Sequence, residues 1–125
     1  MSWIYCNPNL KRRTAGDCVV RGLAIVFDMT WDEAYDEIVA QGKREGEMPS
    51  TNMVLDSYMH LQGFTKYLLP ATCPHCYTIA DFAYEHPYDT YLVGTGTHVV
   101  AVIDGNYYDT WDSGGETPIY YWTRN

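Results

Sequence analysis

The chain has 125 residues, of which 46% are hydrophobic and 19% are charged, the proportions of an ordinary globular protein. This length predicts a single domain spanning 1–125, with enough buried surface for a core. No apolar run approaches the roughly 20 residues of a membrane span. The 8 basic and 16 acidic residues give a net charge of −8. Because nonspecific nucleic-acid binding depends on Lys and Arg that neutralise phosphates, we expect neither nucleic-acid nor membrane partners.

The start of the chain and its cysteines bear on the cellular compartment. Residues 1–6 show no basic start followed by an apolar stretch, so we expect no secretory signal. The four cysteines are Cys6, Cys18, Cys73 and Cys76. Without a secretory signal, we expect reduced thiols in a cytoplasmic protein rather than disulfides.

The beginning of the chain predicts an irregular arm followed by a buried helix. Residues 1–13 are expected to form the arm, with a turn at residues 7–9, where a proline stands between two asparagines. Residues 18–27 are apolar nearly all round, which is typical of a buried central helix. We expect the carboxylate of Asp17 to cap this helix by accepting hydrogen bonds from its first turn.

The later elements follow from spacing, caps and turn residues. Residues 30–33 fit a capping box, and helical spacing closed by a glycine marks two helices. A turn signal at residues 104–106 predicts a hairpin. Because helices come first and strands later, we expect an α+β fold in which N-terminal helices pack on a C-terminal antiparallel sheet. In chain order, the sequence predicts helices at 30–42, 50–63 and 78–85, and strands at 64–69, 91–93, 98–103, 107–111 and 119–122.

Three residues form a candidate catalytic constellation. Cys18 stands in the first turn of the buried helix, where the helix N-terminus favours a thiolate and offers N–H groups to an oxyanion. His98 opens a strand, and its imidazole can take the thiol proton and return it to a leaving group. Asp109 lies across the hairpin, where a carboxylate can hold the imidazole ring. The sequence therefore predicts a nucleophile, a general base and an orienting residue.

The hairpin register decides which carboxylate reaches the histidine. A two-residue loop of Gly105 and Asn106 would place Val102 opposite Asp109. His98 and Asp109 would then share one face, because side chains repeat every second residue. A three-residue loop would shift the register by one and favour Asp112, so both carboxylates remain candidates, with Asp109 preferred.

The segments 14–21 (TAGDCVVR), 96–105 (GTHVVAVIDG) and 108–113 (YDTWDS) resemble small papain-like cysteine hydrolases of bacteria and their viruses. The resemblance implies a papain-like fold and cleavage of an amide or isopeptide bond in a peptide or protein substrate, without a cofactor. It also implies that Cys18, His98 and Asp109 take the three catalytic roles. These enzymes often hold the oxyanion with a Gln before the nucleophile. No Gln precedes Cys18 here, which makes the amides of Asn7 and Asn9 the candidates.

Two other functions remain open from the sequence. A non-catalytic binding or inhibitory protein, for example a viral antagonist of a host factor, can keep the same fold without turnover. The motif from Cys73 to Cys76 lies between a predicted strand and a predicted helix, which is the context of a thiol–disulfide oxidoreductase. The same two cysteines are weak candidates for a metal site, but a closed zinc site needs two further ligands. We expect no metal.

Overall fold

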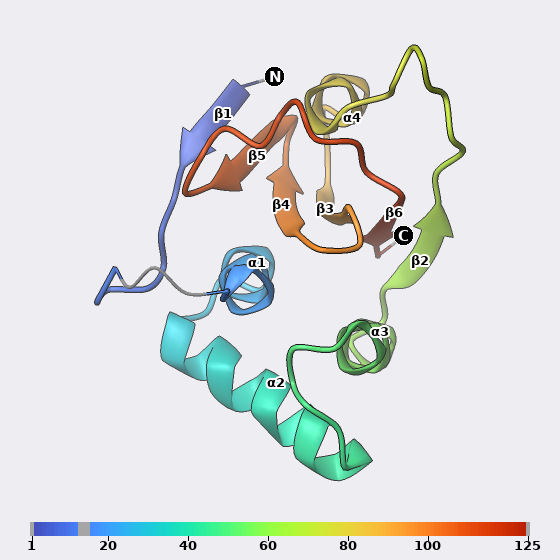
Figure 1. Ribbon diagram of the computed structural model, residues 1–125. Helices are drawn as coiled ribbons and strands as arrows, with labels where there is room; N and C mark the ends of the chain where they lie inside the picture. Colours follow the sequence, from blue (N-terminus) through green and yellow to red (C-terminus); the bar gives the residue numbers. More distant parts are fainter. Residues whose placement is uncertain (1, 13–15, 125) are drawn as a thin grey trace.

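The computed structural model describes residues 2–12 and 16–124, which form four helices and a six-stranded sheet (Figure 1). The fold class is mixed α+β, as the sequence predicts. None of the helices in the described part of the chain has the length and apolarity needed to cross a bilayer. In chain order the elements are β1 (Ser2–Tyr5), α1 (Cys18–Val26), α2 (Trp31–Glu45), α3 (Asn52–Leu61), β2 (Thr65–Leu68), α4 (Ile79–Glu85), β3 (Thr90–Gly94), β4 (Val99–Ile103), β5 (Asn106–Asp109) and β6 (Tyr120–Thr123).

The sheet has the strand order β1-β5-β4-β3-β6-β2. The pairing of β1 with β5 is parallel and the other pairs are antiparallel. Two predictions are therefore wrong: residues 2–5 are a strand rather than part of an irregular arm, and the sheet is mixed rather than antiparallel. The reason is that β1 is a largely exposed edge strand in which only Ile4 is partly buried, so it shows no hydrophobic alternation. The strand forms because its backbone pairs with the distant residues of β5.

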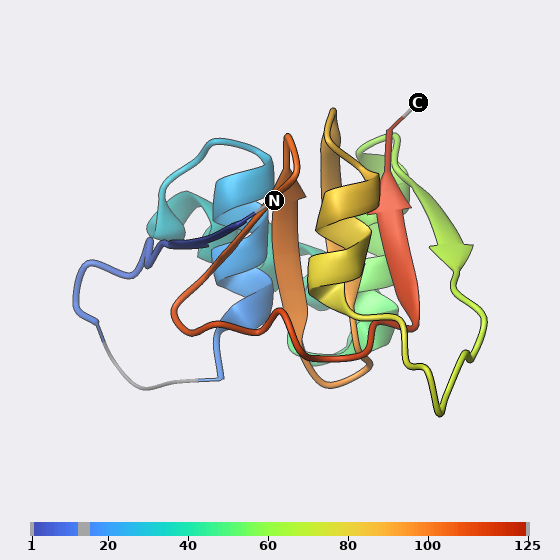
Figure 2. The same ribbon diagram turned by 90° about the horizontal axis from the view of Figure 1, so that it is seen from above.

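Helices cover both faces of the sheet. Figures 1 and 2 show α1, α2 and α3 on one side and α4 on the other. The first core cluster contains Leu23 of α1, which is completely buried, together with Leu92 of the sheet. The second contains Phe82 of α4 with Val100 of β4. The predicted central helix is confirmed, but the sequence did not indicate that α4 would cover the opposite face.

The second helix is longer than predicted. Its capping box at residues 30–33 is confirmed. The helix continues past Gly42 to Glu45 and ends at Gly46, which adopts the left-handed conformation with φ 68°. Gly42 instead allows a close approach, because a Cβ there would lie 2.7 Å from the carbonyl oxygen of Glu47. The glycine that ends this helix is therefore the second one in the segment.

The hairpin between β4 and β5 also differs from its predicted register. Its loop consists of Asp104 and Gly105, both with positive φ (50° and 80°), which suits a tight hairpin turn. Asn106 is the first residue of β5, so the predicted pairing of Val102 with Asp109 is wrong by two residues. Because side chains repeat every second residue, a shift of two leaves the predicted site residues on one face.

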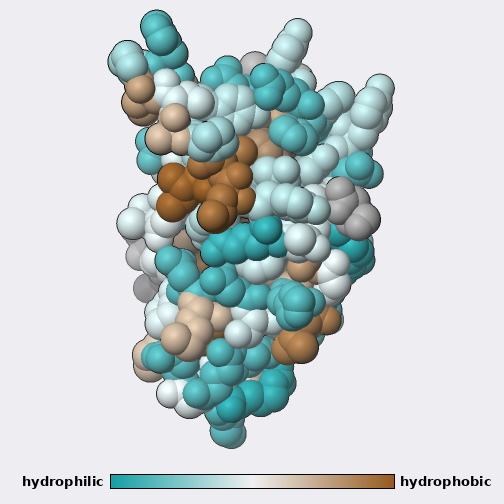
Figure 3. All heavy atoms as spheres, turned by 90° about the vertical axis from the view of Figure 1, so that its right-hand side faces the viewer, coloured by the Kyte–Doolittle hydropathy of each residue, from teal (hydrophilic) through white to brown (hydrophobic). Residues whose placement is uncertain are grey.

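β2 forms one edge of the sheet. Leu68 in this strand is 79% exposed. Ile119, whose backbone carbonyl accepts from the N–H of Leu69, is 49% exposed. Figure 3 views this side of the molecule and shows one large hydrophobic patch and a smaller one within a mostly hydrophilic surface.

Candidate active site

Three elements converge at one end of the sheet. α1 begins at Cys18, β4 begins immediately after His98, and β5 ends at Asp109. Because β4 and β5 are antiparallel, the start of one lies beside the end of the other. The predicted nucleophile, base and orienting residue are thereby brought together at the first turn of α1.

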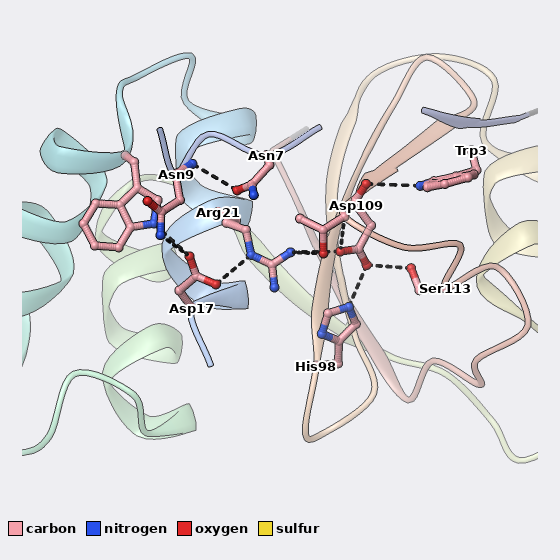
Figure 4. Close-up of polar contacts among 10 residues, drawn as sticks. Trp3, Asn7, Asn9, Asp17, Arg21, His98, Asp109 and Ser113 are labelled. Atoms are coloured by element: carbon pink, nitrogen blue, oxygen red, sulfur yellow. Dashed lines mark hydrogen bonds and ion pairs between the residues drawn. The ribbon is translucent and has the colours of Figure 1, made fainter. Parts of the chain in front are cut away.

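His98 lies between Asp109 and Cys18. Its Nε2 lies 2.7 Å from Oδ2 of Asp109 (Figure 4), and it lines one cleft together with Cys18. The indole of Trp111 lies over the imidazole ring at a tilt, with 5.3 Å between ring centres. Burial disfavours the charged imidazolium, but the hydrogen bond to Asp109 and the interaction with Cys18 outweigh burial and raise the pKa of His98 to about 9.

Cys18 is half-buried and does not take part in a disulfide. Burial alone would raise its pKa. Polar interactions with His98 and with the backbone of Val99, together with the positive charges of His98 and Arg21, outweigh burial and hold the pKa of Cys18 below its ordinary value. A lowered thiol pKa beside a raised imidazole pKa favours a thiolate–imidazolium pair, and the thiolate is the nucleophilic form.

Asp109 is almost completely buried, and each of its oxygens has two partners. Oδ2 accepts from His98 and from the hydroxyl of Ser113, both at 2.7 Å. Oδ1 accepts from Nη1 of Arg21 at 3.0 Å and from the backbone N–H of Thr110 at 2.8 Å. Burial opposes ionisation, but the hydrogen bonds from His98 and Ser113 outweigh it and lower the pKa of Asp109.

The alternative carboxylate, Asp112, belongs to a different contact. Its Oδ1 accepts from the Tyr107 hydroxyl at 2.6 Å and from the backbone N–H of Gly114 at 3.0 Å. His98 takes Asp109 as its partner instead. The two-residue hairpin loop is the physical reason, because it keeps Asp109 on the histidine's face.

The two candidate oxyanion residues lie in the arm that precedes α1. The side-chain amide of Asn9 donates to Oδ2 of Asp17 at 3.4 Å, and the side-chain Oδ1 of Asn7 accepts from the Asn9 backbone N–H at 3.1 Å (Figure 4). The Asn9 amide is thus directed toward Asp17 rather than toward Cys18. The first turn of α1, which begins at Cys18, offers N–H groups that have no acceptor within the helix.

The predicted role of Asp17 as a side-chain cap is wrong. Its carboxylate makes no cap hydrogen bond to α1. Oδ1 accepts from Nε of Arg21 at 2.9 Å, and Oδ2 accepts from the Trp31 indole at 3.0 Å. The Arg21 guanidinium and the Trp31 indole therefore take the place of the backbone N–H groups of α1 as donors to this carboxylate. Asp17 stands at the cap position, but its side chain links α1 to α2.

A cleft of about 740 Å³ opens at Cys18 and His98, a size typical of ligand sites. Its lining includes apolar and aromatic residues, of which the Trp31 and Tyr35 rings stack with 5.1 Å between centres. It also includes hydroxyl, amide and glycine residues. The first group comprises Trp31, Tyr35, Ile38, Val39 and Pro49, and the second Ser50, Thr51, Asn52, Gly96 and Thr97.

Sequence reasoning missed two residues of the site. Arg21 contacts Asp109 across the helix–sheet boundary, and Trp31 joins the cleft wall to Asp17. A signal for Arg21 was present, because it is the one basic residue in an otherwise apolar helix and stands three residues after Cys18. Trp31 carried no comparable signal, since its indole acts through a tertiary contact.

Cys73 and Cys76 form a disulfide in an exposed loop between β2 and α4. The expectation of reduced thiols is therefore wrong for this pair, because the loop brings the two side chains together. α4 begins only at Ile79, after its cap Thr78, so neither cysteine stands at a helix N-terminus. The described residues contain no cluster of three or more metal-ligating side chains.

A scan of protein-family models finds no match to the chain. Searches among curated proteins and among solved structures find no match either. The arrangement of side chains around Cys18 is therefore the basis for inferring a function.

Proposed function

We propose that the protein is a papain-like cysteine hydrolase that cleaves an amide or isopeptide bond in a peptide or protein. One observation carries the proposal: Cys18 and His98 line the same cleft, and the His98 ring hydrogen bonds to the buried carboxylate of Asp109. A thiol at a helix start, an imidazole and an orienting carboxylate are the groups that acyl transfer to sulfur requires.

In the proposed reaction, the Cys18 thiolate attacks the substrate carbonyl carbon. The resulting oxyanion is stabilised by N–H groups of the first turn of α1. The His98 imidazolium gives its proton to the leaving amine as the carbon–nitrogen bond breaks, which leaves a thioester on Cys18. His98 then takes a proton from water, whose oxygen attacks the thioester. The acid product leaves, and the thiolate and imidazolium are restored. Asp109 holds the ring throughout.

The cleft favours a substrate with a bulky uncharged group next to the scissile bond. Its lining includes the aromatic rings of Trp31 and Tyr35. The carboxylate of Asp17, which also lines the cleft, is already paired with the Arg21 guanidinium. His98 in the cleft is likewise paired with Asp109. A charged substrate group would therefore lose its hydration here without gaining an unpaired ionic partner.

Hydrolysis of fluorogenic peptide amides tests the proposal. The set carries aromatic, aliphatic, acidic or basic residues beside the reporter amide. We expect the native protein to cleave the uncharged members, and Cys18→Ser to lose at least 100-fold in kcat, because a hydroxyl is a poor nucleophile without strong base assistance. Cys6→Ser is the matched control and keeps native activity.

The same experiment separates hydrolysis from binding. Saturable binding of these peptides with no turnover, by native protein and Cys18→Ser alike, would overturn the hydrolase proposal and favour a binding protein. Covalent labelling of Cys18 by a peptide chloromethyl ketone, absent in His98→Ala, would support an active nucleophile independently of turnover.

A further inference from the structure

Arg21 is a buried cation between two carboxylates. It stands on α1 one turn after Cys18, and its side chain is only 11% exposed. Nε donates to Asp17 Oδ1 at 2.9 Å, while Nη1 donates to Asp109 Oδ1 at 3.0 Å and to the Thr110 hydroxyl at 3.1 Å (Figure 4). The guanidinium therefore joins the start of α1 to the end of β5.

This contact constrains the orientation of Asp109. A carboxylate can rotate and exchange its oxygens unless each oxygen has a fixed partner. Arg21 and the Thr110 N–H hold Oδ1, which leaves Oδ2 directed at His98. The planar, always charged guanidinium suits such a bridge, whereas a lysine ammonium lacks the fork geometry needed to serve two carboxylates at once.

We propose that Arg21 is a positioning residue, which holds Asp109 against His98 and fixes the first turn of α1, with Cys18, against the end of β5. The inference rests on the proposed hydrolase function. Arg21 is not among the described residues that line the cleft, so it acts through Asp109 and Cys18 rather than on the substrate.

The charge of Arg21 also reaches the thiol. Among the described residues, the titratable and charged groups that interact with Cys18 are His98, Arg21 and Tyr120. Of these, His98 and Arg21 are the cations, and both lower the pKa of Cys18. Loss of the Arg21 charge therefore raises the pH at which the thiolate forms, and loosening of the Asp109–His98 contact acts in the same direction.

The test measures the rate of Cys18 alkylation by iodoacetamide against pH, with each labelled cysteine identified by mass. The variants are Arg21→Gln, Arg21→Lys and, as a matched control on α2, the exposed Arg44→Gln. We expect the rise in rate to move to higher pH in Arg21→Gln, so that its rate at pH 6 falls about threefold to tenfold, since one pKa unit is tenfold in thiolate. Arg21→Lys keeps the charge but loses the fork geometry, so its profile should move less than that of Arg21→Gln, and Arg44→Gln has no effect.

A merely structural salt bridge predicts a different result. Arg21→Gln would then melt at lower temperature while its pH profile stayed native, which would overturn the proposal. If Arg21→Gln does not fold, peptide hydrolysis by Arg21→Lys is the test. We expect the kcat of Arg21→Lys to fall severalfold with KM unchanged. A native kcat in this variant would refute the positioning role. If native Cys18 reacts no faster than Cys6, the hydrolase proposal itself fails. A fast native Cys18 with an unmoved profile in Arg21→Gln refutes only the role of Arg21.

Discussion

Asp109 shows how the surroundings of one side chain determine the chemistry of its neighbours. Its backbone carbonyl accepts from the Trp3 indole and from the Cys6 N–H, both at 3.1 Å. Its carboxylate is divided between His98 on one oxygen and Arg21 on the other. A buried carboxylate with no free lone pair toward solvent stays ionised and fixed, and so it stabilises a charged imidazole.

We therefore predict that Asp109→Asn lowers kcat for peptide hydrolysis by about 10²–10⁴-fold, as loss of an orienting carboxylate does elsewhere. The His98 imidazolium, with a pKa raised to about 9, persists until the pH passes that value. Without the carboxylate the pKa falls, so the alkaline decline in kcat/KM should begin at lower pH. Asp112→Asn is the control and should leave the decline in place. An alkaline decline unmoved by Asp109→Asn would show that the carboxylate does not govern the histidine.

The sequence was sufficient to predict the three central residues of the site. It was insufficient to predict the residues that hold them in place. Cys18, His98 and Asp109 stand out because each residue type has a chemical use at a helix start, strand start or hairpin. Arg21 and Trp31 acquire their roles only where a helix meets a strand or another helix. The prediction for Asp17 was wrong because local propensity favours a side-chain cap at this position. Its carboxylate instead accepts from Arg21 and from the Trp31 indole of α2.

Elements were predicted best where their signal was local. The capping box of α2 and the burial of α1 depend on neighbours within a few residues, and both are confirmed. The strand β1 and the side of the sheet covered by α4 depend on distant partners. The pairing of β3 with β6 is another long-range feature: Gly94 faces Tyr120, and the tyrosine ring folds over the glycine.

This contact gives a stability prediction. A Cβ on Gly94 would lie 2.2 to 2.5 Å from atoms of the buried Tyr120 ring, so the ring must move. We expect Gly94→Ala to lower the free energy of unfolding by about 1–3 kcal/mol, the usual cost of overpacking a core. Gly115→Ala, where nothing lies within 4 Å of the added atom, should stay within about 0.5 kcal/mol. Urea denaturation measures both, and equal values for the two variants would contradict the packing argument.

At the scale of the whole molecule, Cys18 and the Cys73–Cys76 disulfide belong to different parts of the fold. The cleft opens where α1 meets the start of β4, whereas the Cys73–Cys76 disulfide lies in the exposed loop between β2 and α4. Within the described residues, that loop contributes nothing to the cleft lining. A hydrolase that uses Cys18 therefore has no need of the disulfide for its chemistry.

We predict that the double variant Cys73→Ser/Cys76→Ser keeps the alkylation rate of Cys18 and the peptide hydrolysis of the native protein within about twofold, because neither sulfur reaches the cleft or acts as nucleophile. Cys18→Ser should lose hydrolysis while keeping the native circular dichroism spectrum. The opposite pattern, with activity lost only in the double variant, would identify a thiol–disulfide oxidoreductase.

The central claim is that His98 activates the Cys18 thiol, and the pH dependence of alkylation tests it most directly. Cys6 is the internal reference, because burial raises the pKa of its thiol while the pKa of Cys18 is lowered. The account predicts that Cys18 reaches its half-maximal rate at lower pH than Cys6, and that His98→Ala moves the Cys18 profile to higher pH and leaves that of Cys6 unchanged. Coincident profiles for the two cysteines, unaffected by His98→Ala, would contradict it.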